Sequence, residues 1–196
     1  MDAFKKFSLK QGKDWRVRYN PRTAIPEAII GGRTTRYGGS AEEAAAAFLS
    51  DNKDLLNVDF SQLRLAYKKE FMGTAHLNYQ QFYKGLPVEF SYVRIHVDKD
   101  GAVSGYQAKF EPAISLSLIA LISPDYAVSA ALADLGHPLK IKKTSLVIFP
   151  DEAEGVLKLA WKILGRGKGS WVYYVDASNA KVLFKYDDLR YACPAF

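Results

Sequence analysis

Residues Gly73–Pro112 read GTAHLNYQQFYKGLPVEFSYVRIHVDKDGAVSGYQAKFEP. This pattern predicts three strands joined by two tight turns, at Lys84–Pro87 and Asp98–Gly101, where glycine supplies the positive φ of a tight reversal. The middle strand alternates cleanly between two faces. One face carries Val93, Ile95 and Val97, and the opposite face carries Tyr92, Arg94, His96 and Asp98. The sequence therefore predicts a three-stranded antiparallel element with one buried face.

The composition is that of a globular protein with a hydrophobic core. The chain has 196 residues, of which 48% are hydrophobic and 24% charged, enough for one large domain or two small ones. The formal net charge of +6 fits a nucleic-acid binder, a partner for an acidic surface or an ordinary soluble protein. Because lysine and arginine are scattered, with no basic block longer than a pair, a solvated surface is the simplest interpretation.

Neither the cysteine content nor the first residues decide the cellular compartment. Cys193 is the single cysteine of the sequence, so no internal disulfide can form. Met1–Lys6 lacks the apolar run of a secretory signal, which leaves a cytosolic protein or one whose signal was trimmed. The longest largely apolar stretch, Ile114–Ile122, has nine residues, two of which are serine, whereas a membrane-spanning helix needs about 20. We therefore expect no membrane insertion.

The residues before Gly73 predict three further strands and one helix. The first fifteen residues are polar and basic, and we expect them to be loosely held. Trp15–Tyr19 alternates like a strand, and Ile29–Ile30 predicts a second short one. Ser40–Glu43 is a capping box, which predicts the start of a helix. Ser61–Phe71 alternates like a strand, although its pattern also permits a helix.

A second helix and a second set of strands follow Glu111–Pro112, which is the predicted domain boundary. Ser123 as N-cap, Pro124 at the first helical position and Gly136 as C-terminal cap predict the helix. The strands predicted after it are Ser145–Phe149, Leu157–Ile163, Trp171–Val175 and Val182–Tyr186. Because a helix followed by antiparallel strands occurs twice, the sequence predicts an α+β fold of two modules, each an antiparallel sheet packed with one helix.

Several residues of the two modules match the motifs of known domains. In the first module these are His76, Gln80, Gln81, Gly85, Pro87, Val88, Asp98 and Gly101. With them, this module resembles the fungalysin/thermolysin propeptide domain, the pro-region of secreted zinc metalloproteases. Ile122–Pro124, Ala127, Ala130–Ala131 and Trp171–Ala177 make the second module similar to a PepSY domain. Ala180 departs from the glycine that often stands near this point in PepSY hairpins.

The resemblance implies a domain order, a fold and a function. Residues 1–112 would be the propeptide-like domain, 113–190 the PepSY-like domain and 191–196 a C-terminal tail, with cystatin-like folds. The function implied is that of a noncatalytic pro-region, an intramolecular chaperone and inhibitor of a thermolysin- or fungalysin-type zinc metalloprotease, in cis or in trans. The location implied is secreted, periplasmic or in the cell envelope, with the signal peptide removed. The alternative is a free-standing extracytoplasmic PepSY-type binding module without a protease partner.

The C-terminal tail is the expected contact with the protease, because such a pro-region continues there into its enzyme. The residues we expect at this contact are Arg190, Tyr191 and Cys193. A thiolate is a strong zinc ligand, so Cys193 can cap a catalytic zinc, but an inert thiol or a disulfide to a downstream segment is the simpler interpretation.

No catalytic or metal site is apparent from the spacing of residues. A zinc protease needs H-E-x-x-H on a helix, whereas His76, His96 and His137 are far apart in the sequence. We therefore expect no enzyme activity, no metal and no cofactor, and a small enzyme of another kind has little support. His76 and His96 on neighbouring strands permit a noncatalytic metal site, but ordinary hydrogen bonds are the simpler interpretation.

Three other signals also have simple structural interpretations. Gly165–Ser170 imitates the end of a phosphate-binding loop but precedes a strand, which favours a basic hairpin loop. Asp98–Gly101 is similar to the start of a calcium loop but lacks the later ligands, so we expect a β-turn. Tyr173 and Tyr174 fall on opposite faces, whereas Phe184 and Tyr186 share a face that we expect to be core. We therefore expect no stacking platform for bases and no nucleic-acid partner.

Overall fold

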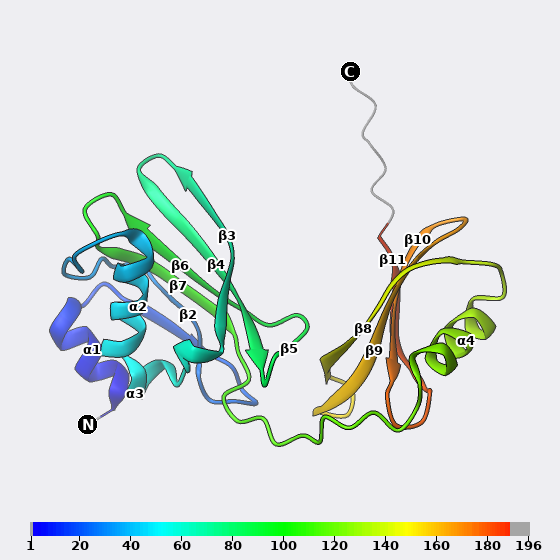
Figure 1. Cartoon of the computed structure of the whole chain (residues 1–196). Helices are drawn as coiled ribbons and strands as arrows, with labels where there is room; N and C mark the ends of the chain where they lie inside the picture. The colour runs from blue at the N-terminus through cyan, green and yellow to red at the C-terminus, as the bar shows by residue number, and fades with distance from the viewer. Residues whose placement is uncertain (1, 189–196) are drawn as a thin grey trace. The chain divides into compact units, whose positions relative to one another are not determined.

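The computed structural model describes residues 2–188, and the chain divides into two compact units. The first unit ends at Ile114 and the second begins at Ser115 (Figure 1). Each unit has its own antiparallel sheet with at least one helix, so the predicted α+β class is confirmed. Within the described part of the chain, no helix has the length and hydrophobicity to cross a membrane.

The first unit is built on a seven-stranded sheet. Six strands lie in the order β1-β2-β7-β6-β4-β3, every neighbouring pair is antiparallel, and the seventh strand, β5, pairs with β4. The strands are β1 (Arg16–Tyr19), β2 (Pro26–Ile30), β3 (Leu63–Phe71), β4 (Thr74–Tyr83), β5 (Leu86–Pro87), β6 (Tyr92–Asp98) and β7 (Val103–Lys109). The three strands predicted from Gly73–Pro112 are thus β4, β6 and β7.

The first predicted turn differs from the observed connection. Leu86–Pro87 is not part of a tight reversal between two long strands, but forms β5, which pairs with the end of β4. Lys84 and Gly85, both with positive φ, make the turn between β4 and β5. Proline lacks an N–H and is tolerated in an edge strand such as β5. The chain then needs Val88–Ser91 to reach β6.

One face of the first sheet forms the core of this unit. Val93, Ile95 and Val97 of β6 are buried, as the alternation predicts. Helix α2 (Ala41–Asp51) packs on this face and buries Phe48 and Leu49. Its capping box is present, because Ser40 Oγ accepts from the Glu43 N–H and the Glu43 carboxylate accepts from the Ser40 N–H.

The prediction that the first fifteen residues are loosely held is wrong. Ala3–Gln11 forms helix α1, which Asp2 caps. Phe7 is buried, and its ring centroid lies 5.3 Å from that of Trp15 in an edge-to-face contact. This aromatic contact orders the segment although most of its side chains are polar. Two short helices complete the unit, α3 (Lys53–Leu56) and the 3-10 turn η1 (Phe60–Gln62).

The second unit is a four-stranded sheet with one helix. The strands lie in the order β11-β10-β9-β8, again antiparallel throughout. They are β8 (Lys140–Asp151), β9 (Val156–Arg166), β10 (Ser170–Asp176) and β11 (Val182–Asp187). Helix α4 (Pro124–Leu135) begins after the Ser123 cap and ends at Gly136, which adopts the left-handed conformation as predicted.

Both faces of the second sheet bury side chains. On the face that α4 covers, Tyr173 packs with Ala127 and Ile163. On the other face, Tyr174 packs with Phe149 and Ala160, so the two tyrosines lie on opposite faces as predicted. Phe184 was expected in a core but is 44% exposed, because it lies on the edge strand β11 at the margin of the Tyr174 cluster.

Candidate functional site

Three of the motif residues, Gln80, Gln81 and Val88, hold the connection between β4 and β6 and tie the end of β4 to the residues that follow β7. Gln81 is fully buried; its Oε1 accepts from the Glu111 N–H (3.0 Å) and its Nε2 donates to the Glu111 carbonyl (2.9 Å). Gln80 Nε2 donates to the carbonyl of Val88, and the Val88 N–H donates to the Gln81 carbonyl at 3.0 Å. These amides replace strand hydrogen bonds where the chain leaves the sheet, which explains why two adjacent glutamines stand there.

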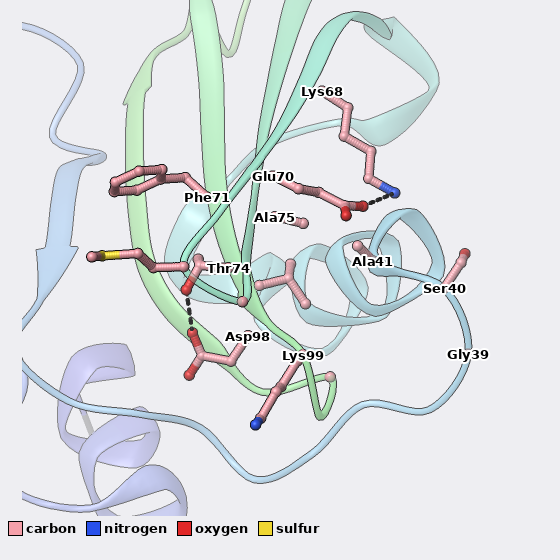
Figure 2. A pocket seen from close by; sticks show the side chains of 14 residues that line it. Gly39, Ser40, Ala41, Lys68, Glu70, Phe71, Thr74, Ala75, Asp98 and Lys99 are labelled. Carbon is pink, nitrogen blue, oxygen red and sulfur yellow. Dashed lines mark hydrogen bonds and ion pairs between the residues drawn. The ribbon is translucent and has the colours of Figure 1, made fainter.

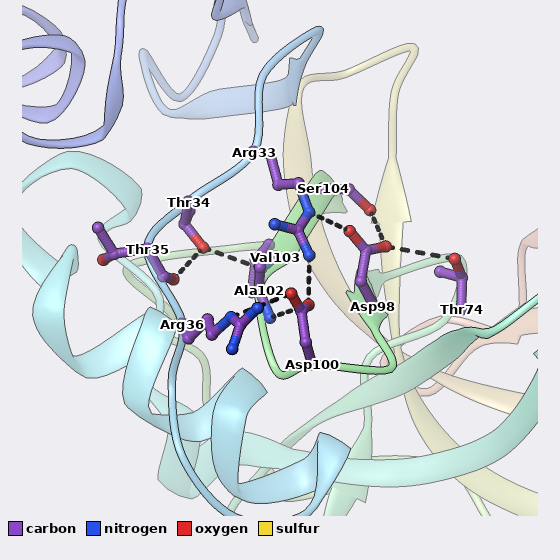
Figure 3. A network of polar contacts seen from close by, with 10 residues as sticks. All are labelled: Arg33, Thr34, Thr35, Arg36, Thr74, Asp98, Asp100, Ala102, Val103 and Ser104. Atoms are coloured by element: carbon purple, nitrogen blue, oxygen red, sulfur yellow. Dashed lines mark hydrogen bonds and ion pairs between the residues drawn. The ribbon is translucent and has the colours of Figure 1, made fainter.

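Two further motif residues, Asp98 and Gly101, attach the β6–β7 turn to the loop between β2 and α2, which contains Arg33. Arg33 Nε donates to Asp98 at 2.7 Å, and the other arm of its guanidinium bonds Asp100 (Figure 3). Arg36 adds a second cation beside Asp100 at 3.1 Å. Gly101 has φ of +82°, and its N–H bonds the Asp98 carbonyl at 2.8 Å. The predicted β-turn is therefore present, and its two carboxylates form ion pairs with Arg33 and Arg36.

The Arg33 guanidinium also changes the acidity of the turn. Its hydrogen bond to Asp100 lowers the pKa of that carboxyl group below the usual value for aspartate. The same bonds raise the pKa of Arg33. Arg33 and Asp100 therefore form an ion pair at neutral pH.

A pocket of about 410 Å³ lies between this turn, the β3–β4 hairpin and the start of α2 (Figure 2). We call it the hairpin-tip pocket. At its rim the hairpin turns through Met72 and Gly73, which both have positive φ, as a two-residue hairpin turn requires. Phe71 is 66% exposed and Met72 is 89% exposed. These two adjacent apolar side chains make the hairpin tip a candidate contact surface.

A second pocket, of about 820 Å³, lies on the open face of the same sheet. We call it the histidine pocket, because His76 of β4 and His96 of β6 lie opposite each other in it. Their Nδ1 atoms are 2.5 Å apart and their ring centroids 4.7 Å apart. The other side chains that line it are mostly polar or aromatic: Tyr67, Lys69, Glu70, Phe71, Leu77, Asn78, Arg94 and Gln107.

Sequence reasoning missed the residue that makes room for this pair. Gly105 of β7 lies opposite His96, and a Cβ atom at Gly105 would come within 2.8 Å of the His96 ring. A glycine inside a strand often marks such a close approach, so the signal was present in the sequence. Burial, then the neighbouring His76 and Arg94, lower the pKa of His96. These neighbours thus favour the neutral form of His96.

The remaining candidates are placed as follows. Gly85 lies in the β4–β5 turn and Pro87 in β5. Gly165–Ser170 connects β9 to β10, with a hydrogen bond from the Gly167 N–H to the Gly169 carbonyl, so it is a hairpin loop. Among residues 2–188, no three His, Cys, Asp or Glu side chains gather in a way that could hold a metal ion. Arg190, Tyr191 and Cys193 lie outside the described residues.

Residues 65–110, which include β4, β6, β7 and most of β3, match the fungalysin/thermolysin propeptide motif. The chain carries this propeptide motif. The motif thus covers the histidine pocket and the hairpin tip, together with the eight residues that carry the resemblance. In metalloprotease precursors such a region is a noncatalytic segment.

Similarity to metalloproteases extends beyond the propeptide motif. Bacillolysin of Brevibacillus brevis is 25% identical over 207 residues, which cover 95% of this chain and 37% of that protein. Thermolysin of Alicyclobacillus acidocaldarius subsp. acidocaldarius is 25% identical over 201 residues, covering 93% and 36% respectively. The chain thus spans little more than a third of the length of these relatives, and it is homologous to the thermolysin and bacillolysin precursors over most of its own length.

Among solved structures, the Bacillus megaterium YpeB C-terminal domain is similar with a TM-score of 0.43 and 17% identity. That similarity covers 91% of this chain and 86% of the YpeB chain.

Proposed function

We propose that this chain is the noncatalytic pro-region of a thermolysin- or fungalysin-type zinc metalloprotease, and that it both templates the folding of the catalytic domain and inhibits it. The observation that carries this proposal is the propeptide motif over residues 65–110, within a similarity that covers nearly the whole chain but little more than a third of bacillolysin and thermolysin. A pro-region needs no catalytic residues, only a surface complementary to the native enzyme. Selective binding to the native enzyme stabilises it by mass action.

The two units would supply different parts of this surface. The propeptide-like domain, residues 1–112, and the PepSY-like domain, residues 113–190, would each contact the catalytic domain, in cis or in trans. Arg190, at the end of the PepSY-like domain, and Tyr191 and Cys193 of the tail would lie nearest the active cleft. The chain would act outside the cytoplasm, where the enzymes of such precursors act.

Within the first unit, the exposed Phe71 and Met72 at the rim of the hairpin-tip pocket are our candidate contact residues. Exposed aromatic and methionine side chains are enriched at protein interfaces, and a few such anchors supply most of the binding energy. The β3 edge beside them is interrupted by a bulge between Leu65 and Tyr67 and carries Lys68 and Lys69, which protects an edge from unspecific pairing. The contact would therefore be made by side chains at the tip.

The direct test uses the metalloprotease encoded in the same or the neighbouring gene. The purified chain is titrated into its catalytic domain while peptide hydrolysis is followed, and the refolding yield of that domain is measured with and without the chain. We expect inhibition and a higher refolding yield. If the chain does neither, the proposal is wrong; recovery of acidic cell-envelope polymers in a salt-sensitive pull-down would then favour the free-standing binding module.

A matched pair of variants tests the tip itself. Phe71→Thr with Met72→Asn removes the apolar surface, and asparagine tolerates the positive φ of position 72. We expect inhibition to weaken about tenfold, a loss of about 1.4 kcal/mol. Ile119→Ser with Leu121→Ser removes two exposed apolar side chains of the second unit and is the control. Unchanged inhibition by the Phe71→Thr/Met72→Asn variant would exclude a role for the tip.

A further inference from the structure

The contact between His76 and His96 is unusual for two basic side chains. They are register partners on β4 and β6, half-buried, with Nδ1 atoms 2.5 Å apart. Two imidazoles approach so closely only when a proton, or another electrophile, lies between the two nitrogen lone pairs. The pair therefore directs two nitrogen atoms at one point in space.

The surroundings fix this direction. The His96 ring lies over Gly105, where any larger residue would displace it. On the other side of β4, Lys69 of β3 pairs with His76. The Lys69 ammonium lies 5.6 Å from the centre of the Tyr67 ring. Strand pairs on both sides thus hold the two histidines on adjacent central strands, and a rigid sheet is a better support for a ligand site than a loop.

The nearby positive charges have partners of their own. Arg94 Nε donates to Asn78 Oδ1 at 2.9 Å, and its guanidinium lies 4.2 Å from the centre of the Tyr92 ring. Asp98, two residues beyond His96 on the same face of β6, adds a negative charge that partly offsets Arg94. The point between the two Nδ1 atoms is therefore not occupied by a neighbouring cation.

We propose that His76 and His96 form a two-imidazole binding site for a divalent transition-metal ion, with Cu²⁺ bound most tightly and Ni²⁺ and Zn²⁺ less so. Imidazole nitrogen suits these ions, and their affinities for a nitrogen site follow this order. The ion takes the place of the proton between the Nδ1 atoms. With metal–nitrogen bonds of about 2.0–2.1 Å, the nitrogens must be about 2.9 Å apart at the right angle of a square-planar Cu²⁺ site and about 3.3 Å apart at a tetrahedral angle, so the rings must separate by less than about 1 Å.

The histidine pocket leaves space for the other ligands. Two imidazoles fill only part of a coordination sphere, and the pocket of about 820 Å³ admits water or a small carboxylate at the remaining positions. The proposal does not rest on a role as pro-region.

The test measures metal binding directly. Untagged chain carrying Cys193→Ser, which removes the single thiol, is titrated with CuCl₂, NiCl₂ and ZnCl₂ at pH 7.5 in a calorimeter. We expect one Cu²⁺ per chain. His76→Ala and His96→Ala should each weaken binding at least about tenfold, since losing a ligand costs no less than losing a residue that orients one. His137→Ala, which removes the third histidine from the second unit, should leave the affinity unchanged.

A second measurement needs no substitution of either ligand. Substoichiometric Cu²⁺ should broaden the NMR ring signals of His76 and His96 before those of His137. Absence of binding, equal broadening of all three histidines or an affinity that survives both single substitutions would each overturn the proposal, and the pair would then be a histidine–histidine hydrogen bond only.

Discussion

Tyr106 and Tyr173 are both fully buried, but their hydroxyl groups have different surroundings. The Tyr173 hydroxyl bonds Asp134 Oδ2 at 3.0 Å, and Lys185 bonds the same oxygen at 2.6 Å. The Tyr106 hydroxyl has no hydrogen-bond partner within residues 2–188. Burial accordingly raises the pKa of Tyr106, because no donor stabilises a phenolate there.

Replacing each tyrosine with phenylalanine should therefore have opposite effects. Tyr106→Phe removes an unpaired buried hydroxyl and should raise the free energy of unfolding by about 1 kcal/mol. Tyr173→Phe removes one hydrogen bond to Asp134, which keeps its bond from Lys185, and should lower the free energy of unfolding by about 0.5–1.5 kcal/mol. Urea denaturation followed by tyrosine and tryptophan fluorescence measures both. Destabilisation by Tyr106→Phe would mean that its hydroxyl is bonded in solution.

The bond between Arg33 and Asp100 predicts a dependence of stability on pH. The pKa of Asp100 is lowered in the folded state, so the unfolded chain binds a proton more readily, and stability rises with pH in that range. The contribution is present above the unfolded value of about 4 and is lost as the pH falls through the lower folded value. Arg33→Gln should flatten the acid limb of a plot of stability against pH.

Lys140→Gln is the control for net charge, because it removes one cation from the second unit. It should keep the slope of the parent chain below pH 4. An unchanged slope in Arg33→Gln would show that the bond to Asp100 does not persist in solution.

Two turns of the first sheet contain a glycine with positive φ, and they differ in the space around that glycine. Gly85 and Gly101 have similar positive φ angles, of +88° and +82°. A Cβ atom at Gly101 would lie 2.1 Å from the Tyr37 carbonyl oxygen, whereas nothing lies within 4 Å of one at Gly85. The two sites therefore share the conformational cost of a side chain but differ in the available space.

Gly101→Ala should consequently cost more than Gly85→Ala. We expect about 1–2 kcal/mol at position 85, from the left-handed conformation alone, and more than about 3 kcal/mol at position 101, where the backbone must also move. Thermal and urea unfolding of the two variants provide the comparison. Equal costs would mean that the 33–37 segment is not packed against the turn.

In the β10–β11 hairpin, a residue other than glycine has a positive φ. Ala180, which stands where PepSY-like sequences often have glycine, has φ of +64°. A left-handed alanine costs about 1 kcal/mol, so Ala180→Gly should raise the melting temperature of the second unit. The gain is reduced because the Ala180 side chain packs at the margin of the α4 core. A lower melting temperature would show that this packing outweighs the relieved backbone.

The whole molecule has separate hydrophobic cores on either side of Ile114. The core of the first unit draws on α1, α2 and the first sheet, and those of the second unit on α4 and the second sheet. A unit with its own hydrophobic core can in principle fold alone. We propose that the units are independent domains, with the boundary within a few residues of Glu111–Pro112.

Separate expression tests this independence. A fragment of residues 1–114 should show a cooperative thermal transition and the near-ultraviolet circular dichroism of packed aromatic rings. The intact chain should then unfold in two steps, one of which coincides with the fragment's transition. An unfolded fragment would mean that the second unit is needed to hold the first.

Local sequence patterns were sufficient for much of the fold and part of the candidate site. The capping box at Ser40, the caps of α4 and the alternation of β6 each depend on a few adjacent residues, and all appear in the structure. Helix α1 was missed because its order comes from Phe7 packing against Trp15, beyond the helix itself. The sequence predicted strand β3 but not that most of its side chains are exposed. They are exposed because β3 lies at the edge of the sheet, and the edge position depends on which strands pair.

The sequence by itself determined that His76 and His96 lie on the polar faces of two strands, because side-chain direction in a strand follows a period of two. It also determined the propeptide resemblance, which residues 65–110 bear out. Only the tertiary structure decided that the two histidines meet over Gly105, because a shift of one residue in the pairing of β4, β6 and β7 would separate them. Register is set by the core on the opposite face of the sheet, so a contact on the open face cannot be read from either strand alone.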